Sequence, residues 1–235
     1  MEESLPVNLI DTPSYYFPNI SQLDFTEETL VAYSFDASID RMVEAYRQGC
    51  YLMPIDSYEP LLFWWANAPR LIIIPEEAKF SKSLRQLLRK NCYQVKIDTR
   101  FEEVVQNCKN MEREGAWINE KVVETYLNMH EAGYSHSVEV YRDGKMVGGL
   151  FGTSIGAMFA GESMFHLESN TSKIAFYYLM QVLPELNIQF VDCQQVSKHF
   201  LEWGGRVVSC RDFYARLHDA LQMPTQQYKW TRLLA

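Results

Sequence analysis

The sequence has no run that approaches the ~18 consecutive apolar residues of a membrane-spanning helix. Its first residues, Met1–Ser4, do not resemble the start of a signal peptide. Its five cysteines include no Cys-x-x-Cys pair, and its five histidines are scattered without the spacing of metal ligands. These absences argue against a disulfide framework and predict free thiols, no metal site and a cytoplasmic protein without a membrane anchor.

The chain also lacks a general excess of positive charge and the common nucleotide-binding motifs. Its formal net charge is −8, which argues against a basic coat for nucleic acid over the whole surface but leaves room for a local patch. No Walker A or dinucleotide-binding fingerprint is present. The segment 161–165 lacks the second glycine of a nucleophile elbow, so Ser163 is a poor candidate for a nucleophile.

What is present is the alternation of helices and strands found in globular proteins. At 235 residues the chain can fold as one large domain or two small ones. Residues 1–37 look loosely organised and residues 50–60 look like a turn-rich connection. Hydrophobic periodicity and capping residues predict helices over 38–48, 79–90, 101–111, 119–130, 174–183 and 196–203. They predict strands over 61–65, 71–74, 92–97, 137–141, 145–151, 157–160, 189–192 and 207–208.

The second half runs helix, hairpin, strand, helix, strand, helix, strand, which resembles the acetyltransferase-like layout of a twisted mixed sheet flanked by helices. We therefore predict an α/β (α+β) protein, with an acetyltransferase-like catalytic domain over residues 79–235 and a smaller N-terminal domain over residues 1–78. An acyl-CoA N-acyltransferase is then one hypothesis. Those enzymes resemble one another in a glycine-containing loop that holds the CoA pyrophosphate at a helix N-terminus. Residues 168–173 contain no glycine, which disfavours CoA binding.

The stretch 148–194 concentrates the candidate chemistry. Glycines recur inside its strand-like segments, which marks close approach of a backbone or a ligand. Glu162 and Asp192 lie in apolar neighbourhoods, where an unpaired carboxylate is costly. Because Asp192 and Gln194 are two residues apart on a predicted strand, both should face the same side. A carboxylate and an amide carbonyl together can orient an amine and relay its proton; a salt bridge, a helix cap or a loop hydrogen bond are the structural alternatives.

Two other features suit a nucleic acid. The helix predicted over 79–90 carries five cations and no acidic residue on one side: Lys79, Lys82, Arg85, Arg89 and Lys90. Such a run is either a solvated face or a footprint for phosphates. The loop 114–118 presents Trp117, which can stack on a base or fill a hinge. The apolar stripe of the helix that follows is expected to be core, with Tyr126 as the exception.

These residues together resemble the leucyl/phenylalanyl-tRNA–protein transferase family. The resemblance runs in colinear order from about Ala45 to Phe213. It is carried by Ala45-Tyr46-Arg47-Gln48-Gly49, Trp64-Trp65 with Pro69-Arg70, Ser81-Lys82-Ser83-Leu84, Arg113-Glu114-Gly115 with Trp117-Ile118, His136-Ser137-Val138-Glu139-Val140, Val147-Gly148-Gly149-Leu150, Gly161 to Phe165, Ser172-Lys173, and Asp192-Cys193-Gln194.

The resemblance implies an enzyme that moves leucine, phenylalanine or methionine from its tRNA ester onto the N-terminal Arg or Lys of a protein, which creates a degradation signal. An aminoacyl ester is already activated, so no cofactor is expected, and we expect a cytoplasmic monomer. The implied amine-handling residues are Glu162, Asp192 and Gln194. The implied tRNA contacts are Trp65 and Trp117 at the terminal adenosine and Lys82, Arg85, Arg89 and Lys90 at the acceptor stem. The implied aminoacyl pocket is lined by Leu150, Phe159, Phe176, Leu179 and Val191.

The sequence also departs from the family pattern, mostly in its N-terminal part. Ser34-Phe35-Asp36 replaces Gly-Gly-Asp, and Ala66-Asn67-Ala68-Pro69-Arg70 replaces Ser-Pro-Asp-Pro-Arg after the two tryptophans. Contacts with tRNA and the choice of acceptor are therefore the properties most open to change. A non-catalytic reader of tRNA or of protein N-termini is the alternative from another functional class, since it would keep Glu162 and the tryptophans.

Overall fold

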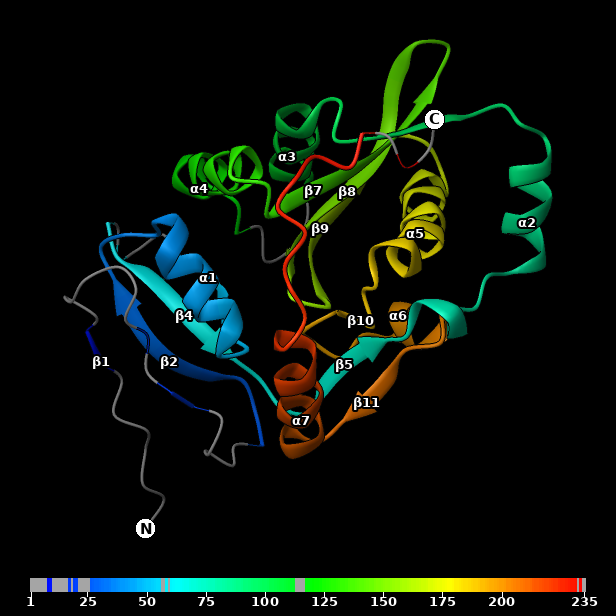
Figure 1. Ribbon diagram of the computed structural model, residues 1–235. Helices are drawn as coiled ribbons and strands as arrows, with labels where there is room; N and C mark the ends of the chain where they lie inside the picture. Colours follow the sequence, from blue (N-terminus) through cyan, green and yellow to red (C-terminus); the bar gives the residue numbers. More distant parts are fainter. Residues whose placement is uncertain are drawn as a thin grey trace.

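The computed structural model describes residues 8–9, 17, 19–20, 26–55, 58, 60–112, 117–231 and 233. Their strands form two sheets (Figure 1). The smaller sheet has the order β1-β2-β4-β3, with β1 at Asn8–Leu9, β2 at Thr29–Ser34, β3 at Tyr51–Leu52 and β4 at Leu62–Ala66. Helix α1, Ile39–Arg47, connects β2 to β3 and buries Met42, Ala45 and Tyr46.

The larger sheet has seven strands in the order β11-β5-β10-β9-β8-β7-β6. Its strands are β5 at Arg70–Ile73, β6 at Gln94–Ile97, β7 at Ser135–Arg142, β8 at Lys145–Ile155, β9 at Met158–His166, β10 at Phe190–Asp192 and β11 at Arg206–Val208. The β9–β10 pair is parallel and the other pairs are antiparallel, so the sheet is mixed. The predicted fold class, α/β with a mixed sheet, is confirmed.

Helices cover both faces of the larger sheet (Figure 1). One face packs against α3, Phe101–Lys109, and α4, Glu120–Glu131; the opposite face packs against α5, Thr171–Val182. Helix α2, Lys82–Arg89, lies on the outer side of α5, and the short η2, Pro75–Glu77, and η3, Leu183–Leu186, lie near it. Helices α6, Lys198–Glu202, and α7, Cys210–Leu221, flank β11 in the chain. The buried apolar residues accordingly form two clusters, one on each face.

Local sequence signals explain the boundaries of several elements. Ser81 and Asn119 begin α2 and α4, because their side chains accept the backbone N–H of Leu84 and Val122 respectively. Asp143-Gly144 joins β7 to β8 with φ of 51° and 76°, the left-handed pair that a two-residue hairpin turn requires.

The glycine-rich strand serves helix packing. A Cβ placed on Gly148 of β8 would overlap the side chain of Thr171, at the start of α5. Only glycine therefore lets α5 approach the sheet this closely. The strand glycines predicted a close approach by a backbone or a ligand. At Gly148 the group that approaches is Thr171 of the protein itself.

Several helices and strands differ from those predicted from the sequence. Residues 1–37 were expected to be loose, yet β2 lies inside the smaller sheet between β1 and β4. The turn-rich connection after residue 50 contains β3, and α7 was not anticipated. Strand β9 continues through Glu162 to His166, well beyond the predicted end at residue 160.

Three further expectations concern the whole chain. None of the five cysteines, all of them described, is in a disulfide. No helix within the described part of the chain is long and apolar enough to cross a membrane. A domain boundary after residue 78 stays a prediction, and β5, which precedes it, pairs with β10 and β11 in the larger sheet.

Candidate active site

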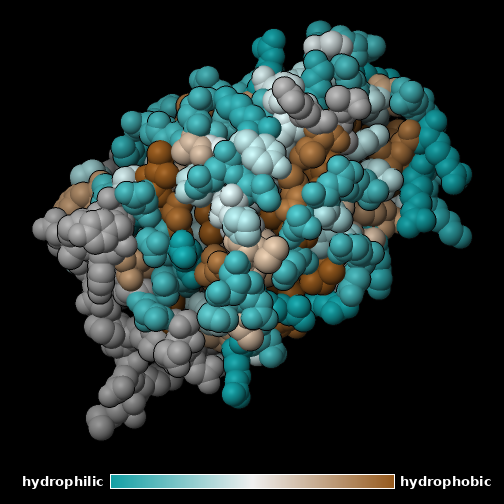
Figure 2. All heavy atoms as spheres, in the orientation of Figure 1, coloured by the Kyte–Doolittle hydropathy of each residue, from teal (hydrophilic) through white to brown (hydrophobic). Residues whose placement is uncertain are grey.

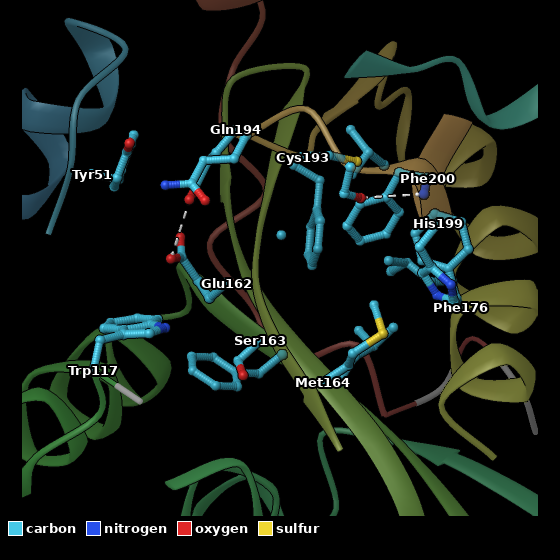
Figure 3. Close-up of a pocket in the computed structure, with 18 of the residues that line it drawn as sticks. Tyr51, Trp117, Glu162, Ser163, Met164, Phe176, Cys193, Gln194, His199 and Phe200 are labelled. Atoms are coloured by element: carbon cyan, nitrogen blue, oxygen red, sulfur yellow. Dashed lines mark hydrogen bonds between the residues drawn. The ribbon is translucent and has the colours of Figure 1, made fainter. Parts of the chain in front are cut away.

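A cavity lies where the pairing of β9 with β10 ends. The two strands pair from Met158 with Phe190 to Ala160 with Asp192, and β9 then continues while β10 ends. The cavity beside this point has a volume of about 400 Å³. Strands β8, β9 and β10, helices α5 and α6, and the segments around Tyr51 and Trp117 supply its walls (Figure 3). The cavity therefore lies beside the end of β10, where β9 continues without this partner.

One end of the cavity is mostly apolar, with His199 lying beside Phe176 and Phe200 (Figure 3). All five residues predicted for the aminoacyl pocket line it, although they come from four elements: Leu150 of β8, Phe159 of β9, Phe176 and Leu179 of α5, and Val191 of β10. Met164 and Phe200 add to the same lining. Helix α5 places two of the predicted residues on one wall because positions three apart share a helix face.

The other end carries polar side chains (Figure 3). Glu162 and Gln194 both line the cavity, with Gln194 Nε2 3.5 Å from Glu162 Oε2. Tyr51 and Trp117 lie on the same side of the cavity, away from Phe176 and Phe200 (Figure 3). One cavity therefore joins an apolar compartment to a carboxylate and an amide.

Two buried tyrosines support Glu162 from behind. The Tyr46 hydroxyl donates to Glu162 Oε1 at 2.5 Å, and it lies 3.1 Å from the Tyr126 hydroxyl. Burial raises the pKa of the Glu162 carboxyl to about 7, against the opposing effect of the hydrogen bonds from Tyr46 and Tyr126. The carboxyl can thus change its protonation state close to neutral pH, as groups in functional sites often do.

Asp192 is placed differently from its predicted position. Its carboxylate is bound by Arg70 through two hydrogen bonds, Nε to Oδ1 at 2.8 Å and Nη2 to Oδ2 at 2.6 Å, and its side chain is 2% exposed. Asp192 Oδ1 also accepts the backbone N–H of Gln194 at 2.9 Å. Asp192 is not among the described residues that line the cavity. Its carboxylate contacts the Gln194 backbone and Arg70, both on the protein side of the site.

The expectation that strand alternation aligns Asp192 with Gln194 is wrong. Strand β10 ends at Asp192, and Gln194 has a φ of 60°, which a residue with a side chain rarely adopts without external support. The support comes from both sides of the residue. Asp192 accepts the backbone N–H of Gln194. The backbone carbonyl oxygen of Gln194 accepts hydrogen bonds from Asn67 Nδ2 at 3.2 Å and from the Leu71 N–H at 3.2 Å.

Asn67 links this turn to the buried ion pair. Its Oδ1 accepts Arg70 Nη1 at 3.1 Å while its Nδ2 donates to Gln194. The guanidinium of Arg70 is thereby held by Asp192 and Asn67 together. The result is a rigid base under Gln194, built from the connection between β4 and β5.

The residues predicted to bind tRNA are not all at the cavity. Trp117 lines it and packs edge-on against Tyr126, with ring centroids 6.3 Å apart. Trp65 is half-buried on β4, and its Nε1 donates to the carbonyl of Met53, which lines the cavity. The part of the tryptophan loop at 113–116, including the matching stretch Arg113-Glu114-Gly115, lies outside the described residues.

The predicted cations form an exposed face on α2. Lys82, Arg85, Arg89 and Lys90 are all exposed, and none of them is in an ion pair with another residue that the structure describes. In Figure 2 this edge of the molecule is covered by hydrophilic side chains. The opposite side of the segment is apolar: Phe80 packs against Phe176, with ring centroids 6.4 Å apart. One aromatic contact thus connects the basic helix to the wall of the cavity.

Sequence reasoning gave no role in the site to Tyr46, Tyr126 and Arg70. Tyr126 was expected to stand apart from the core, whereas it is fully buried with its hydroxyl beside Tyr46. A buried arginine needs a carboxylate partner, so an Arg in a strand of apolar residues was the available signal for the Asp192 pair.

Comparison with known proteins decides the family. The family model described as leucyl/phenylalanyl-tRNA protein transferase matches residues 72–218, and the model of its N-terminal domain matches residues 35–66. The chain belongs to this family. Because it does, it is an aminoacyl-tRNA–protein transferase, as its sequence resemblance implied. The two matches together include α2 and the residues that line the cavity, while Asn67 and Arg70 lie in the gap between them.

Individual relatives of the transferase agree over nearly the whole chain. A leucyl/phenylalanyl-tRNA–protein transferase from Syntrophus aciditrophicus is 41% identical over 218 residues, which are 92% of this chain and 90% of that protein. One from Nitrosomonas europaea is 36% identical over 222 residues, covering 94% of this chain and 92% of that protein. Among solved structures, a GCN5-related N-acetyltransferase from Kribbella flavida matches with a TM-score of 0.40 and 12% identity, covering 77% of this chain and 64% of that chain.

Proposed function

We propose that this transferase moves leucine, and less readily phenylalanine or methionine, from its tRNA ester to the α-amine of a protein whose N-terminal residue is Arg or Lys. The product would carry a new apolar N-terminal residue that marks it for degradation in the cytoplasm. The observation that carries the proposal is the joining of an apolar compartment to the Glu162–Gln194 pair in one cavity.

The donor fits this cavity by its shape and polarity. The side chain of the aminoacyl group would lie among Leu150, Phe159, Phe176, Leu179 and Val191. Such a pocket accepts several apolar side chains, because one methylene group changes the binding free energy by only ~1–3 kcal/mol. The terminal adenosine would pack near Trp117 and Trp65, and the phosphates of the acceptor stem would contact the exposed cations of α2.

The polar end fits the attacking amine. Gln194 uses its Nε2 group toward Glu162, which leaves its side-chain carbonyl oxygen to accept a hydrogen bond from the amine. The ionised Glu162 attracts the cationic form of the acceptor and holds it at the ester. Asp192 acts through Gln194, because it fixes the backbone N–H of that residue; we assign it a positioning role in place of direct contact with the amine.

The reaction balances with these two substrates. The amine nitrogen forms a bond with the carbonyl carbon of the ester, and the bond from that carbon to the ribose oxygen breaks. The ammonium first gives one proton to the ionised Glu162, which leaves a nucleophilic amine. A second N–H proton, hydrogen-bonded to the Gln194 carbonyl oxygen, passes to the departing ribose oxygen, so the products are an amide and free tRNA. The ester supplies the activation, and an α-amine with an ordinary pKa of ~7.7–8.0 requires only modest help to lose its proton.

The acceptor preference follows from the charge of the site. No lysine or arginine is among the described residues that line the cavity, while Glu162 contributes a carboxylate. A protein N-terminus that begins with Arg or Lys carries two positive groups within one residue. An acceptor with two positive groups therefore suits an acidic cavity better than an acceptor whose side chain is neutral.

Transfer of label tests the proposal. The protein is incubated with radiolabelled Leu-tRNA and a peptide that begins with Arg, with an N-acetylated copy of the peptide as the control. Label should enter only the peptide with a free α-amine, and without acetyl-CoA. Label that reaches the peptide only when acetyl-CoA is supplied would assign the cavity to a CoA-dependent acyltransferase instead.

A further inference from the structure

A second carboxylate is attached to the polar end of the cavity. Glu28, just before β2, accepts two hydrogen bonds on the same oxygen, Oε1: from the Tyr51 hydroxyl at 2.6 Å and from Gln195 Nε2 at 2.7 Å. Tyr51 and Gln195 both line the cavity, and Tyr51 is itself buried. Two residues of the cavity wall therefore fix an exposed carboxylate at its rim.

Two consecutive glutamines connect the two carboxylates. Gln194 donates its side-chain amide to Glu162, and Gln195 donates its side-chain amide to Glu28. The two carboxylates are thus tied to adjacent positions of one chain segment. An N-terminal Arg or Lys residue likewise carries two cations, its α-amine and its side chain.

The charge of Glu28 is not neutralised by its neighbours in the described part of the chain. It forms no ion pair there, and both of its hydrogen bonds come from neutral groups. Arg70 lies 5.4 Å from the centre of the Tyr51 ring, but its guanidinium is already paired with Asp192. The pKa of the Tyr51 hydroxyl is raised by burial and by its hydrogen bond to Glu28, so Tyr51 remains a donor that orients the carboxylate.

We propose that Glu28 binds the cationic side chain of the acceptor's N-terminal residue, the guanidinium of Arg or the ammonium of Lys, while the α-amine lies at Gln194 and Glu162. The inference rests on the proposed function and names the residue that selects the acceptor. Guanidinium and ammonium groups both bind a carboxylate through charge-assisted hydrogen bonds. Glu28 lies outside both stretches matched by the family models, 35–66 and 72–218.

Citrulline gives the decisive comparison, because it has the shape of arginine without the charge. Transfer of labelled leucine is measured at increasing concentrations of two peptides that differ only in N-terminal Arg or citrulline. Wild-type enzyme should prefer the Arg peptide by about 5- to 10-fold in kcat/KM, an effect in the range of one well-oriented but exposed ion pair. Glu28→Gln should abolish this preference, through an increase in the KM of the Arg peptide.

Two further variants make the test specific. Glu27→Gln changes the exposed neighbouring carboxylate and should retain the full preference for the Arg peptide. Tyr51→Phe removes the hydroxyl that orients Glu28 and should reduce the preference without changing any charge. Raising the salt concentration should weaken the preference in wild-type enzyme and leave Glu28→Gln unaffected.

The outcomes separate this inference from the proposed function. An unchanged Arg preference in Glu28→Gln, equal to that of Glu27→Gln, would show that Glu28 does not read the acceptor and would overturn the inference while transfer itself stands. Absence of leucine transfer by wild-type enzyme would overturn the proposed function.

Discussion

The hydrogen bond between Tyr46 and Glu162 gives a prediction about pH. In the proposed reaction Glu162 acts when it is ionised, because it attracts a cation. Activity should therefore rise with pH through the pKa of this carboxyl, about 7. Tyr46 donates to Glu162 at 2.5 Å and lowers that pKa by stabilising the ionised form. Tyr46→Phe removes the donor, so the pKa should rise and the activity profile should move to higher pH.

The size of the movement follows from the strength of the bond. A hydrogen bond to a charged group contributes about 1.5 kcal/mol or more, and 1.36 kcal/mol corresponds to about one pH unit. The midpoint should therefore move from about 7 to about 8 in Tyr46→Phe. At pH 7 about half of the wild-type carboxyls and about a tenth of the variant carboxyls would be ionised. The variant should be about fivefold slower at pH 7, about tenfold slower at pH 6, and nearly equal to wild type at pH 9.

The assay is single-turnover transfer of labelled leucine to an Arg peptide between pH 6 and 9, corrected for hydrolysis of the ester without enzyme. The acceptor amine titrates identically with both enzymes, so the ratio of their rates isolates Glu162. Tyr33→Phe, in β2, is the matched control and should follow the wild-type profile. A constant loss of rate at every pH would indicate that Tyr46 matters only for folding, and a midpoint that moves downward would refute the reasoning.

Three other changes test the donor, the pocket and the support of the site. Replacing Arg85 and Arg89 by Ala should weaken Leu-tRNA binding and reduce the slope of log K against log salt by about 1.4–1.8, since each phosphate contact contributes about 0.7–0.9. Leu179→Phe reduces the free volume at the apolar end, so transfer of phenylalanine should fall more than transfer of leucine when both charged tRNAs are compared. Asn67→Ala removes one hydrogen bond that holds the carbonyl of Gln194, and the single-turnover rate should fall about tenfold at saturating Leu-tRNA, the effect of ~1.4 kcal/mol in the barrier.

Matched variants control these three measurements. Arg211 and Arg216 are exposed on α7, and their replacement by Ala should leave the salt slope unchanged. Ser34→Ala removes the buried acceptor of Trp64 Nε1 in the smaller sheet, so it should lower thermal stability without a comparable loss of rate. If the Arg85/Arg89 and Arg211/Arg216 variants have equal salt slopes, the basic face of α2 is only a solvated surface and does not contact tRNA. If Asn67→Ala loses no more rate than Ser34→Ala, then Asn67 does not position Gln194 for the reaction.

Much of the fold followed from local signals. The caps at Ser81 and Asn119 and the Asp143-Gly144 turn depend on neighbours in the chain. The turn lies where the sequence predicted it, and α2 begins three residues later than predicted because Ser81 caps it. Strand β2 was missed because its position is set by pairing with β4, more than 25 residues later in the chain. A short strand with this kind of partner leaves little local pattern.

The candidate site also combines features that the sequence indicated with features that depend on distant contacts. The five residues of the predicted pocket line one cavity, and their role in holding the aminoacyl side chain stays a proposal. The apolar pattern alone could not separate a pocket wall from ordinary core. The position of Asp192 was misjudged because alternation along a strand holds only while the strand continues. The left-handed residue Gln194 ends it, and the ion pair with Arg70 joins positions 122 residues apart. Contacts of that range have no signature in a single sequence.

The central claim is that the Glu162–Gln194 end of the cavity handles the attacking amine. The most direct test is the single-turnover rate of Gln194→Ala at saturating Leu-tRNA, with the Kd for Leu-tRNA and the Tm measured on the same preparation. Loss of the group that orients the amine and relays its proton should lower the rate by about 100-fold or more, while the Kd stays within about twofold because the proposed tRNA contacts lie elsewhere. A folded Gln194→Ala enzyme that transfers leucine at the wild-type rate would contradict the account.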